Sequence, residues 1–175
     1  MKEVRPTSNK VLLALFNILG EKIRGCKFLD LFAGTGSIGL EAIKRGAESC
    51  VFVESVKARA DSIKKKSDSL VLSLEIRRAL SWLAKREMKF DIIFADPPYN
   101  AGWTEVLPAL PNLDKIFEKE SIFIIEHSTR EPVTLRENPY NMHIISTREY
   151  GETALTFLIC VSAATNGSHR KGFRL

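Results

Sequence analysis

Short apolar runs alternate with segments of helical periodicity along most of this chain, and this alternation constrains the fold most strongly. The runs have the length of strands and lie at residues 28–32, 50–54, 71–76, 90–95 and 121–126. Helical patterns follow them at residues 37–45, 56–67, 80–87 and, interrupted by prolines, 103–117. Such alternation is typical of a parallel sheet with helices on both faces. The sequence therefore predicts an α/β fold whose ligands bind beyond the carboxyl ends of the strands.

The two ends of the chain depart from this alternation. A further helix ending at Gly20 is predicted before the first run. After the last run, strands at 143–147 and 153–161 are predicted to form an antiparallel hairpin. We expect a single domain over residues 1–162, with a mostly parallel sheet and a C-terminal antiparallel hairpin. Residues 163–175 are expected to form a disordered basic tail.

Composition narrows the class of protein without identifying it. The 175 residues carry a formal net charge of +5, a balance that suggests a polyanionic partner and no more. No apolar run approaches the roughly 18 residues that a membrane span needs. The polar first ten residues lack the apolar stretch of a secretory signal, and the three cysteines show neither metal-ligand nor redox spacing. We therefore expect a cytoplasmic protein with no membrane partner and no metal.

The first apolar run leads into a glycine motif. Residues 34–39 read Gly-Thr-Gly-Ser-Ile-Gly, which fits G-x-G-x-x-G between a strand and a helix. Glu54 ends the next run, where a carboxylate can hold ribose hydroxyls. A side chain at Gly34 or Gly36 would fill space that a closely bound ligand needs, or would block a positive φ. Taken alone, this pattern fits a dinucleotide as well as S-adenosylmethionine.

Asp30, just ahead of the glycine motif, distinguishes between these two cofactors. It lies at the end of the first run, where its side chain is expected to face the ligand. A pyrophosphate there would meet a like charge, which costs several kcal/mol at a separation of about 4 Å. S-adenosylmethionine instead brings an ammonium and a sulfonium, which the carboxylate attracts. We therefore expect S-adenosylmethionine as the cofactor; the alternative interpretation is that Asp30 caps the following helix.

The fourth run leads into Asp96-Pro97-Pro98-Tyr99. Two consecutive prolines fix φ and remove two amide donors, so this backbone can only accept hydrogen bonds. A polar side chain followed by such a backbone can hold an NH₂ group by both hydrogens and aim its lone pair at a methyl donor. Tyr99 offers a ring on which a base swung out of its helix can stack. The motif therefore predicts methyl transfer to an exocyclic amine, achieved mainly by alignment.

The order of Asp-x-Phe-x-Gly-x-Gly and Asp-Pro-Pro-Tyr resembles that of the amino methyltransferases. Three further stretches make the chain similar to the bacterial 16S rRNA guanine-N2 methyltransferase D family: Arg5-Pro6-Thr7, Leu15-Phe16-Asn17 and Glu149-Tyr150-Gly151. This resemblance implies a class I S-adenosylmethionine-dependent methyltransferase fold, which is Rossmann-like. It also implies methylation of the exocyclic N2 of one guanine in 16S rRNA.

The resemblance assigns roles to residues by their position in these motifs. The residues implied to bind the cofactor are Asp30, Phe32, Gly34, Gly36 and Glu54. The residues implied to hold the guanine, and so to be catalytic, are Asp96, Pro97 and Tyr99. The residues expected to contact RNA are Arg5, Lys10 and Pro98. The expected partner is 16S rRNA, in the small ribosomal subunit or its assembly intermediate, and we expect a monomer.

Three features depart from the family pattern. Members usually carry a basic segment before Arg-Pro-Thr, whereas only four residues precede Arg5 here. The first helix has Leu12-Leu13 where the family tends to have Arg-Glu. After the third run, where an Asp or Asn often meets the adenine amine, this chain has Arg77-Arg78, so no side chain is assigned to adenine.

Other functions remain open at this level. An adenine-N6 DNA methyltransferase would use the same proline loop, but such enzymes commonly carry a separate target-reading region. A dinucleotide-dependent oxidoreductase is disfavoured by Asp30 and by the lack of an evident hydride-transfer acid. A catalytically silent RNA-binding assembly factor is disfavoured by the intact motifs.

Overall fold

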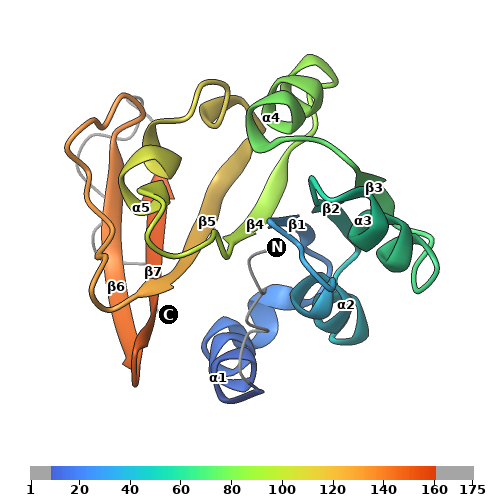
Figure 1. The fold of residues 1–175 in the computed structure, drawn as a ribbon, viewed down its shortest axis with the longest axis horizontal. Coiled ribbons are helices and arrows are strands. Elements are labelled where there is room, and N and C mark those ends of the chain that lie inside the picture. Colours follow the sequence, from blue (N-terminus) through green and yellow to red (C-terminus); the bar gives the residue numbers. More distant parts are fainter. Residues whose placement is uncertain (1–8, 161–175) are drawn as a thin grey trace.

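We describe residues 9–160 of the chain in a computed structural model. The strands of the described residues are β1 (Lys27–Leu31), β2 (Ser49–Val53), β3 (Leu70–Leu72), β4 (Phe90–Ala95), β5 (Phe117–Ser128), β6 (Met142–Tyr150) and β7 (Thr153–Cys160). They form a seven-stranded sheet in the order β3-β2-β1-β4-β5-β7-β6 (Figure 1). Strands β1 to β5 pair in parallel, and β7 runs antiparallel to both β5 and β6. The predicted parallel sheet with a C-terminal antiparallel hairpin is confirmed.

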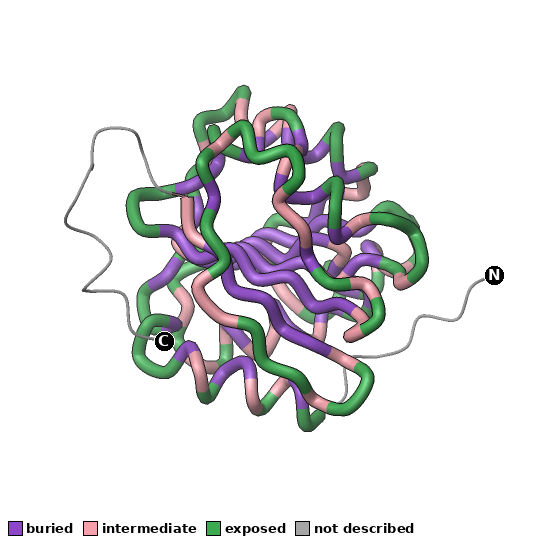
Figure 2. The backbone as a smooth tube through the Cα atoms, turned by 90° about the vertical axis from the view of Figure 1, so that its left-hand side faces the viewer, coloured by how far each residue is buried: buried purple, intermediate pink, exposed green. Residues whose placement is uncertain are grey.

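Helices cover both faces of this sheet. They are α1 (Asn9–Leu19), α2 (Ser37–Lys44), α3 (Lys57–Lys64), α4 (Ile76–Lys85) and α5 (Trp103–Val106), with 3-10 turns η1 (Gly20–Ile23), η2 (Leu107–Ala109) and η3 (Asp114–Ile116). Apolar side chains of α1, α2 and α3 share one buried core with the sheet, and those of α4, η2 and η3 share a second core. Strands buried on both faces read as continuous apolar runs, and Figure 2 shows their backbone buried inside the molecule.

The third strand and the helix after it differ from the sequence-based prediction. A strand over 71–76 and a helix from Leu80 were expected, but β3 ends at Leu72 and α4 begins at Ile76. Ile76 suits either reading, because it continues an alternation with Leu72 and Leu74 and also opens a helical stripe. Packing of that stripe against the sheet decides for the helix. The residue that precedes α4 is therefore Glu75, not the Arg77-Arg78 pair.

The remaining boundaries follow the chemistry of single residues. The first strand ends one residue earlier than predicted, because Phe32 adopts a left-handed φ of 62°. The predicted helix over 103–117 is confirmed as interrupted, because Pro108 and Pro111 cannot continue it. Within the described range, no helix combines the length and apolar character that crossing a membrane would require.

Candidate functional site

The two sequence motifs lie beside each other at one edge of the sheet. Strands β1 and β4 are neighbours, and their register pairs Leu31 with Ala95. The next residues along the two strands are Phe32, which opens the glycine loop, and Asp96, which opens the proline loop. Both loops therefore leave adjacent strands at the same carboxyl edge, where α/β sheets bind ligands.

An aromatic contact joins the two loops directly. The ring of Phe32 packs against the ring of Trp103, the first residue of α5, with centroids 5.1 Å apart and planes inclined at 72°. This edge-to-face arrangement is one that aromatic pairs prefer. Phe32 was predicted to bind the cofactor, and this contact places its ring beside the segment that follows the proline loop. Sequence reasoning did not foresee the pairing, because nothing in the spacing of 71 residues signals it.

Three carboxylates converge on this edge. Asp30 and Glu54 are almost fully buried, at 2% and 5% exposure. Burial raises the pKa of Asp30 to about 8; the Gly39 amide lowers that pKa, and the nearby charges of Asp96 and Glu54 raise it further. An accumulation of negative charge around a buried acid opposes a pyrophosphate and suits a cationic ligand. The neighbouring charges of Asp96 and Glu54 therefore agree with the charge argument, whereas burial keeps Asp30 itself protonated up to a pH near 8.

This raised pKa predicts how stability changes with pH. Below 3.8, the ordinary pKa, Asp30 holds its proton whether the chain is folded or unfolded. As the pH rises toward about 8 the unfolded chain releases that proton while the folded chain keeps it, so the free energy of unfolding falls. Asp30→Asn keeps an oxygen for the Gly39 amide and cannot titrate. In urea titrations, the wild-type free energy of unfolding minus that of the variant should decline across this window and level off above it. A difference that rose with pH would contradict the burial argument.

Asp30 and Glu54 also shape the backbone of the glycine loop. Oδ2 of Asp30 accepts a hydrogen bond from the Gly39 amide at 3.0 Å, in the first turn of α2. Glu54 accepts two, from the Gly34 amide at 2.8 Å and the Val56 amide at 2.7 Å. The alternative interpretation of Asp30 as a helix cap is therefore seen in the structure. Both acids organise the loop from beneath, a role of Glu54 that its spacing did not reveal.

The glycines meet different demands. Gly36 has a φ of 80° and caps the start of α2, and a Cβ there would lie 3.0 Å from the side chain of Ile63. Gly39 has no such φ, but a Cβ on it would lie 2.3 Å from Cε1 of Phe52 and 2.7 Å from Sγ of Cys50. The third glycine of the motif therefore allows α2 to pack closely on β2.

The proline loop presents its residues in alternation. Pro97 is buried, Pro98 is exposed, and Asp96 and Tyr99 are half-buried. The Tyr99 hydroxyl lies 3.2 Å from Oγ1 of Thr153, the first residue of β7. The amide of Asn100 donates a hydrogen bond to the carboxylate of Glu131, on the segment that follows β5. These partners were missed from sequence, because they come from elements far along the chain.

The structure describes two of the three residues that were predicted to contact RNA. Arg5 lies outside the described residues, as does the predicted basic tail. Lys10 is exposed near the start of α1, and Pro98 is exposed in the proline loop. Their contact with RNA stays a prediction.

Other hollows and clusters lie away from this edge. A hollow of about 900 Å³ is lined by Lys27, Ser49, Leu70 and Phe90, which begin their strands, so it lies at the opposite edge from the two motifs. Across residues 9–160, no group of three or more His, Cys, Asp and Glu side chains could hold a metal ion.

Comparison with known proteins places the chain among related sequences. The family model described as conserved hypothetical protein 95 matches residues 1–159. YlbH of Bacillus subtilis is 35% identical over 158 residues, which cover 86% of this chain and 85% of YlbH. The Ribosomal RNA small subunit methyltransferase D of Buchnera aphidicola subsp. Acyrthosiphon pisum is 35% identical over 139 residues, covering 77% of this chain and 73% of that protein.

Solved structures share the fold. The 16S rRNA N2 G1207 methyltransferase of T. thermophilus, solved with AdoMet and guanosine, superposes with a TM-score of 0.58 at 24% identity. The match covers 89% of this chain and 43% of that chain. At this identity the likeness concerns the fold alone. The putative methyltransferase yhhF of Escherichia coli superposes with a TM-score of 0.73 at 26% identity, covering 89% of each chain. The expected class I S-adenosylmethionine-dependent methyltransferase fold is confirmed.

Proposed function

The chain belongs to the family described as conserved hypothetical protein 95, and from this premise we propose that it methylates the exocyclic N2 of a guanine in 16S rRNA. The methyl donor is S-adenosylmethionine. One observation carries the proposal: the glycine loop and the proline loop adjoin at the ends of β1 and β4, above buried carboxylates. Adjoining loops of this kind bring a cationic donor and an amine acceptor within reach of each other.

Cofactor binding is assigned to the glycine-loop side. The set is Asp30, Phe32, Gly34, Gly36 and Glu54. S-adenosylmethionine supplies an electrophilic methyl group on a positively charged sulfur. The residues present fit such a ligand, because Asp30 carries a pKa raised by burial and by two neighbouring acids. A bound cation would offset that repulsion, and Gly36 supplies the positive φ of 80° that the turn needs.

Amine binding is assigned to the proline loop. The carboxylate of Asp96 and the carbonyl of Pro97 accept the two amine hydrogens, and Tyr99 stacks on the base. Held in this way, the nitrogen lone pair would face the methyl group that bound S-adenosylmethionine supplies, in line with the carbon–sulfur bond that the transfer would break as the nitrogen–carbon bond forms. The amine proton passes to Asp96 or to water, after transfer or along with it. Alignment of this kind contributes several kcal/mol without a strong base.

The substrate class is supported by the relatives. Several carry the name Ribosomal RNA small subunit methyltransferase D, and the net charge of +5 suits an RNA partner. Arg5, Lys10 and Pro98 are the proposed RNA contacts. We further propose that the protein acts as a monomer in the cytoplasm, through a single domain over residues 1–162. Its substrate is the small ribosomal subunit or an assembly intermediate of that subunit.

The decisive experiment supplies the protein with labelled S-adenosylmethionine and small subunits from a strain that lacks the gene. We expect one methyl group per subunit, recovered as N2-methylguanosine after nuclease digestion and mass spectrometry. Subunits from the parent strain are the control, and they should accept no label. Label on adenine would replace the guanine assignment. If the deletion strain showed defects in subunit assembly and the protein transferred no methyl group to its subunits, the protein would instead be a silent assembly factor.

The choice of cofactor is tested separately by calorimetry. S-adenosylmethionine should bind with measurable heat, and NAD should not, because its pyrophosphate would meet Asp30. Binding of NAD in preference to S-adenosylmethionine would overturn the cofactor assignment.

A further inference from the structure

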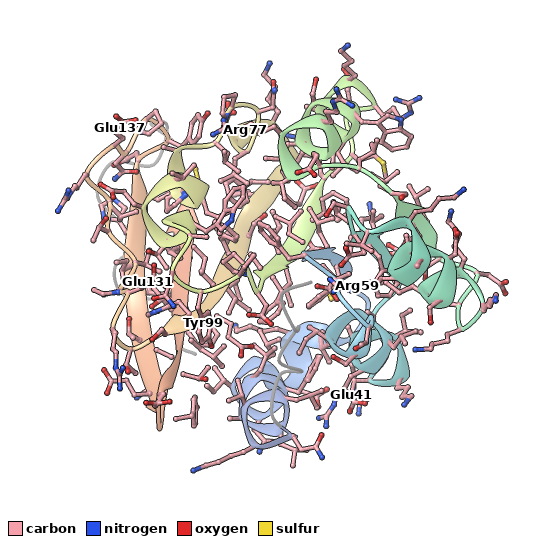
Figure 3. All side chains as sticks on the ribbon, viewed as in Figure 1. Glu41, Arg59, Arg77, Tyr99, Glu131 and Glu137 are labelled. Carbon is pink, nitrogen blue, oxygen red and sulfur yellow. The ribbon has the colours of Figure 1, made fainter. Side chains whose placement is uncertain are left out.

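The end of the proline loop is fastened to two distant segments. The Tyr99 hydroxyl lies 3.2 Å from Oγ1 of Thr153, at the tip of the β6–β7 hairpin. The Asn100 amide donates to Oε2 of Glu131, which follows β5. Figure 3 shows Tyr99 and Glu131 in the same region of the molecule. Two consecutive residues of the loop thus each have a partner outside it.

These two partners belong to one hydrogen-bonded unit. Ser128 pairs with Thr153 where β5 meets β7. One residue further, the Thr129 amide donates to the carbonyl of Glu152 at 3.0 Å. The Arg130 guanidinium also lies 3.0 Å from the Glu152 carboxylate. We call residues 129–131 together with 152–153 the hairpin anchor.

The loop needs this anchor because the prolines fix only part of it. Pro97 and Pro98 have a set φ and no amide hydrogen, so they cannot tie the loop to the sheet through donated bonds. Tyr99 keeps two rotatable side-chain torsions, and Asn100 holds a left-handed φ of 56°. A residue keeps such a backbone conformation when contacts with its surroundings hold it there. The hydrogen bonds of Tyr99 and Asn100 provide these contacts.

We propose that Thr153 and Glu131 are positioning residues, which hold the Tyr99 ring and the Asn100 backbone in the orientation that receives the target base. The proposal rests on the function proposed above. Thr153 acts on the ring through the phenol oxygen, and Glu131 acts on the backbone. Neither is assigned contact with the substrate. The Arg130–Glu152 pair is exposed at both ends, with 82% and 68% of each side chain accessible, so it contributes little.

The kinetic test is Thr153→Val, which keeps the shape of the side chain and removes its hydroxyl. A neutral hydrogen bond is worth about a factor of 2–10 in an equilibrium, so the KM for small subunits should rise about 5-fold. The dissociation constant of S-adenosylmethionine should not change. Thr153→Ser, which restores a hydroxyl, should recover the wild-type KM.

The matched control is Thr147→Val on strand β6 of the same hairpin. Thr147 places its hydroxyl 3.0 Å from that of Thr156 and so makes the same kind of contact away from the loop. It should leave KM unchanged. An equal rise in KM in Thr147→Val would assign the effect to the hairpin as a whole and overturn the specific role of Thr153.

A spectroscopic test needs no substrate. The chain has three tyrosines, Tyr99, Tyr140 and Tyr150, so 3-fluorotyrosine gives three fluorine resonances, of which Tyr99→Phe removes one. That resonance should shift in Thr153→Val and return in Thr153→Ser, while the Tyr140 resonance stays in place. Likewise, the Asn100 amide should exchange faster with deuterium in Glu131→Ala than in wild type or Glu131→Gln.

The outcomes separate this inference from the proposed function. Failure of the wild-type protein to methylate small subunits refutes the function. An active wild type, together with an unmoved KM and an unmoved Tyr99 resonance in Thr153→Val, refutes the positioning role alone. A moved resonance and a raised KM that Thr153→Ser restores support it.

Discussion

Asp96→Ala is expected to lower kcat for methyl transfer by about 100-fold or more while S-adenosylmethionine still binds. The carboxylate opens the proline loop at the end of β4, where it is proposed to hold one amine hydrogen. Without it the amine can rotate away from the methyl carbon, and a misplacement of about 1 Å in a reacting group costs on the order of 10²-fold. Asp30 and Glu54, buried on the side of the site assigned to the cofactor, are unchanged in this variant.

The matched control for this variant is Asp91→Ala, at the other end of the same strand. Asp91 accepts a hydrogen bond from the Lys27 amide at 2.7 Å. Asp91→Ala therefore removes a carboxylate that is half-buried like that of Asp96 but lies far from the site. Single-turnover rates and calorimetric titration of the cofactor should separate the two variants. Near-normal turnover in Asp96→Ala would reject the role of this carboxylate. Loss of cofactor binding would move the role of Asp96 from the amine to the donor.

Gly39→Ala is expected to lower the free energy of unfolding more than any other single substitution named above. The added methyl group would lie 2.3 Å from Cε1 of Phe52 and 2.7 Å from Sγ of Cys50, so α2 must lift away from β2. Overpacking of this kind costs roughly 1–3 kcal/mol, and about 1 kcal/mol lowers Tm by roughly 2–4 °C in a chain of this size. Tm should therefore fall by up to about 10 °C in thermal unfolding followed by circular dichroism.

A double-mutant cycle with Phe52→Leu tests the cause. Phe52 is fully buried, so the single change costs stability, but it clears the atom nearest to the new methyl group. The double variant should therefore lose less stability than the sum of the two single losses. Additive losses would mean that the contact with Phe52 is not the source of the strain. Gly39→Ala with an unchanged Tm would contradict the packing argument altogether.

Local pattern was sufficient for most of the sheet and for both motifs. The strands before the glycine loop and the proline loop were predicted because they are apolar on both faces, and the structure places them within one or two residues. The resemblance to the methyltransferase D family is likewise confirmed. Pattern failed at Ile76, whose position fits a strand and a helix equally. There the packing of α4 on the sheet decided the outcome.

The sequence by itself determined that a glycine loop and a proline loop open from parallel strands toward one edge, because parallel strands present their carboxyl ends together. Only the tertiary structure decided which side chains support those loops. Tyr99 and Thr153 are 54 residues apart, and Asn100 and Glu131 are 31 apart. The first pair exists because β7 lies beside β5, and the second because β5 lies beside β4. Strand order of that kind depends on packing between distant elements, which no local spacing encodes.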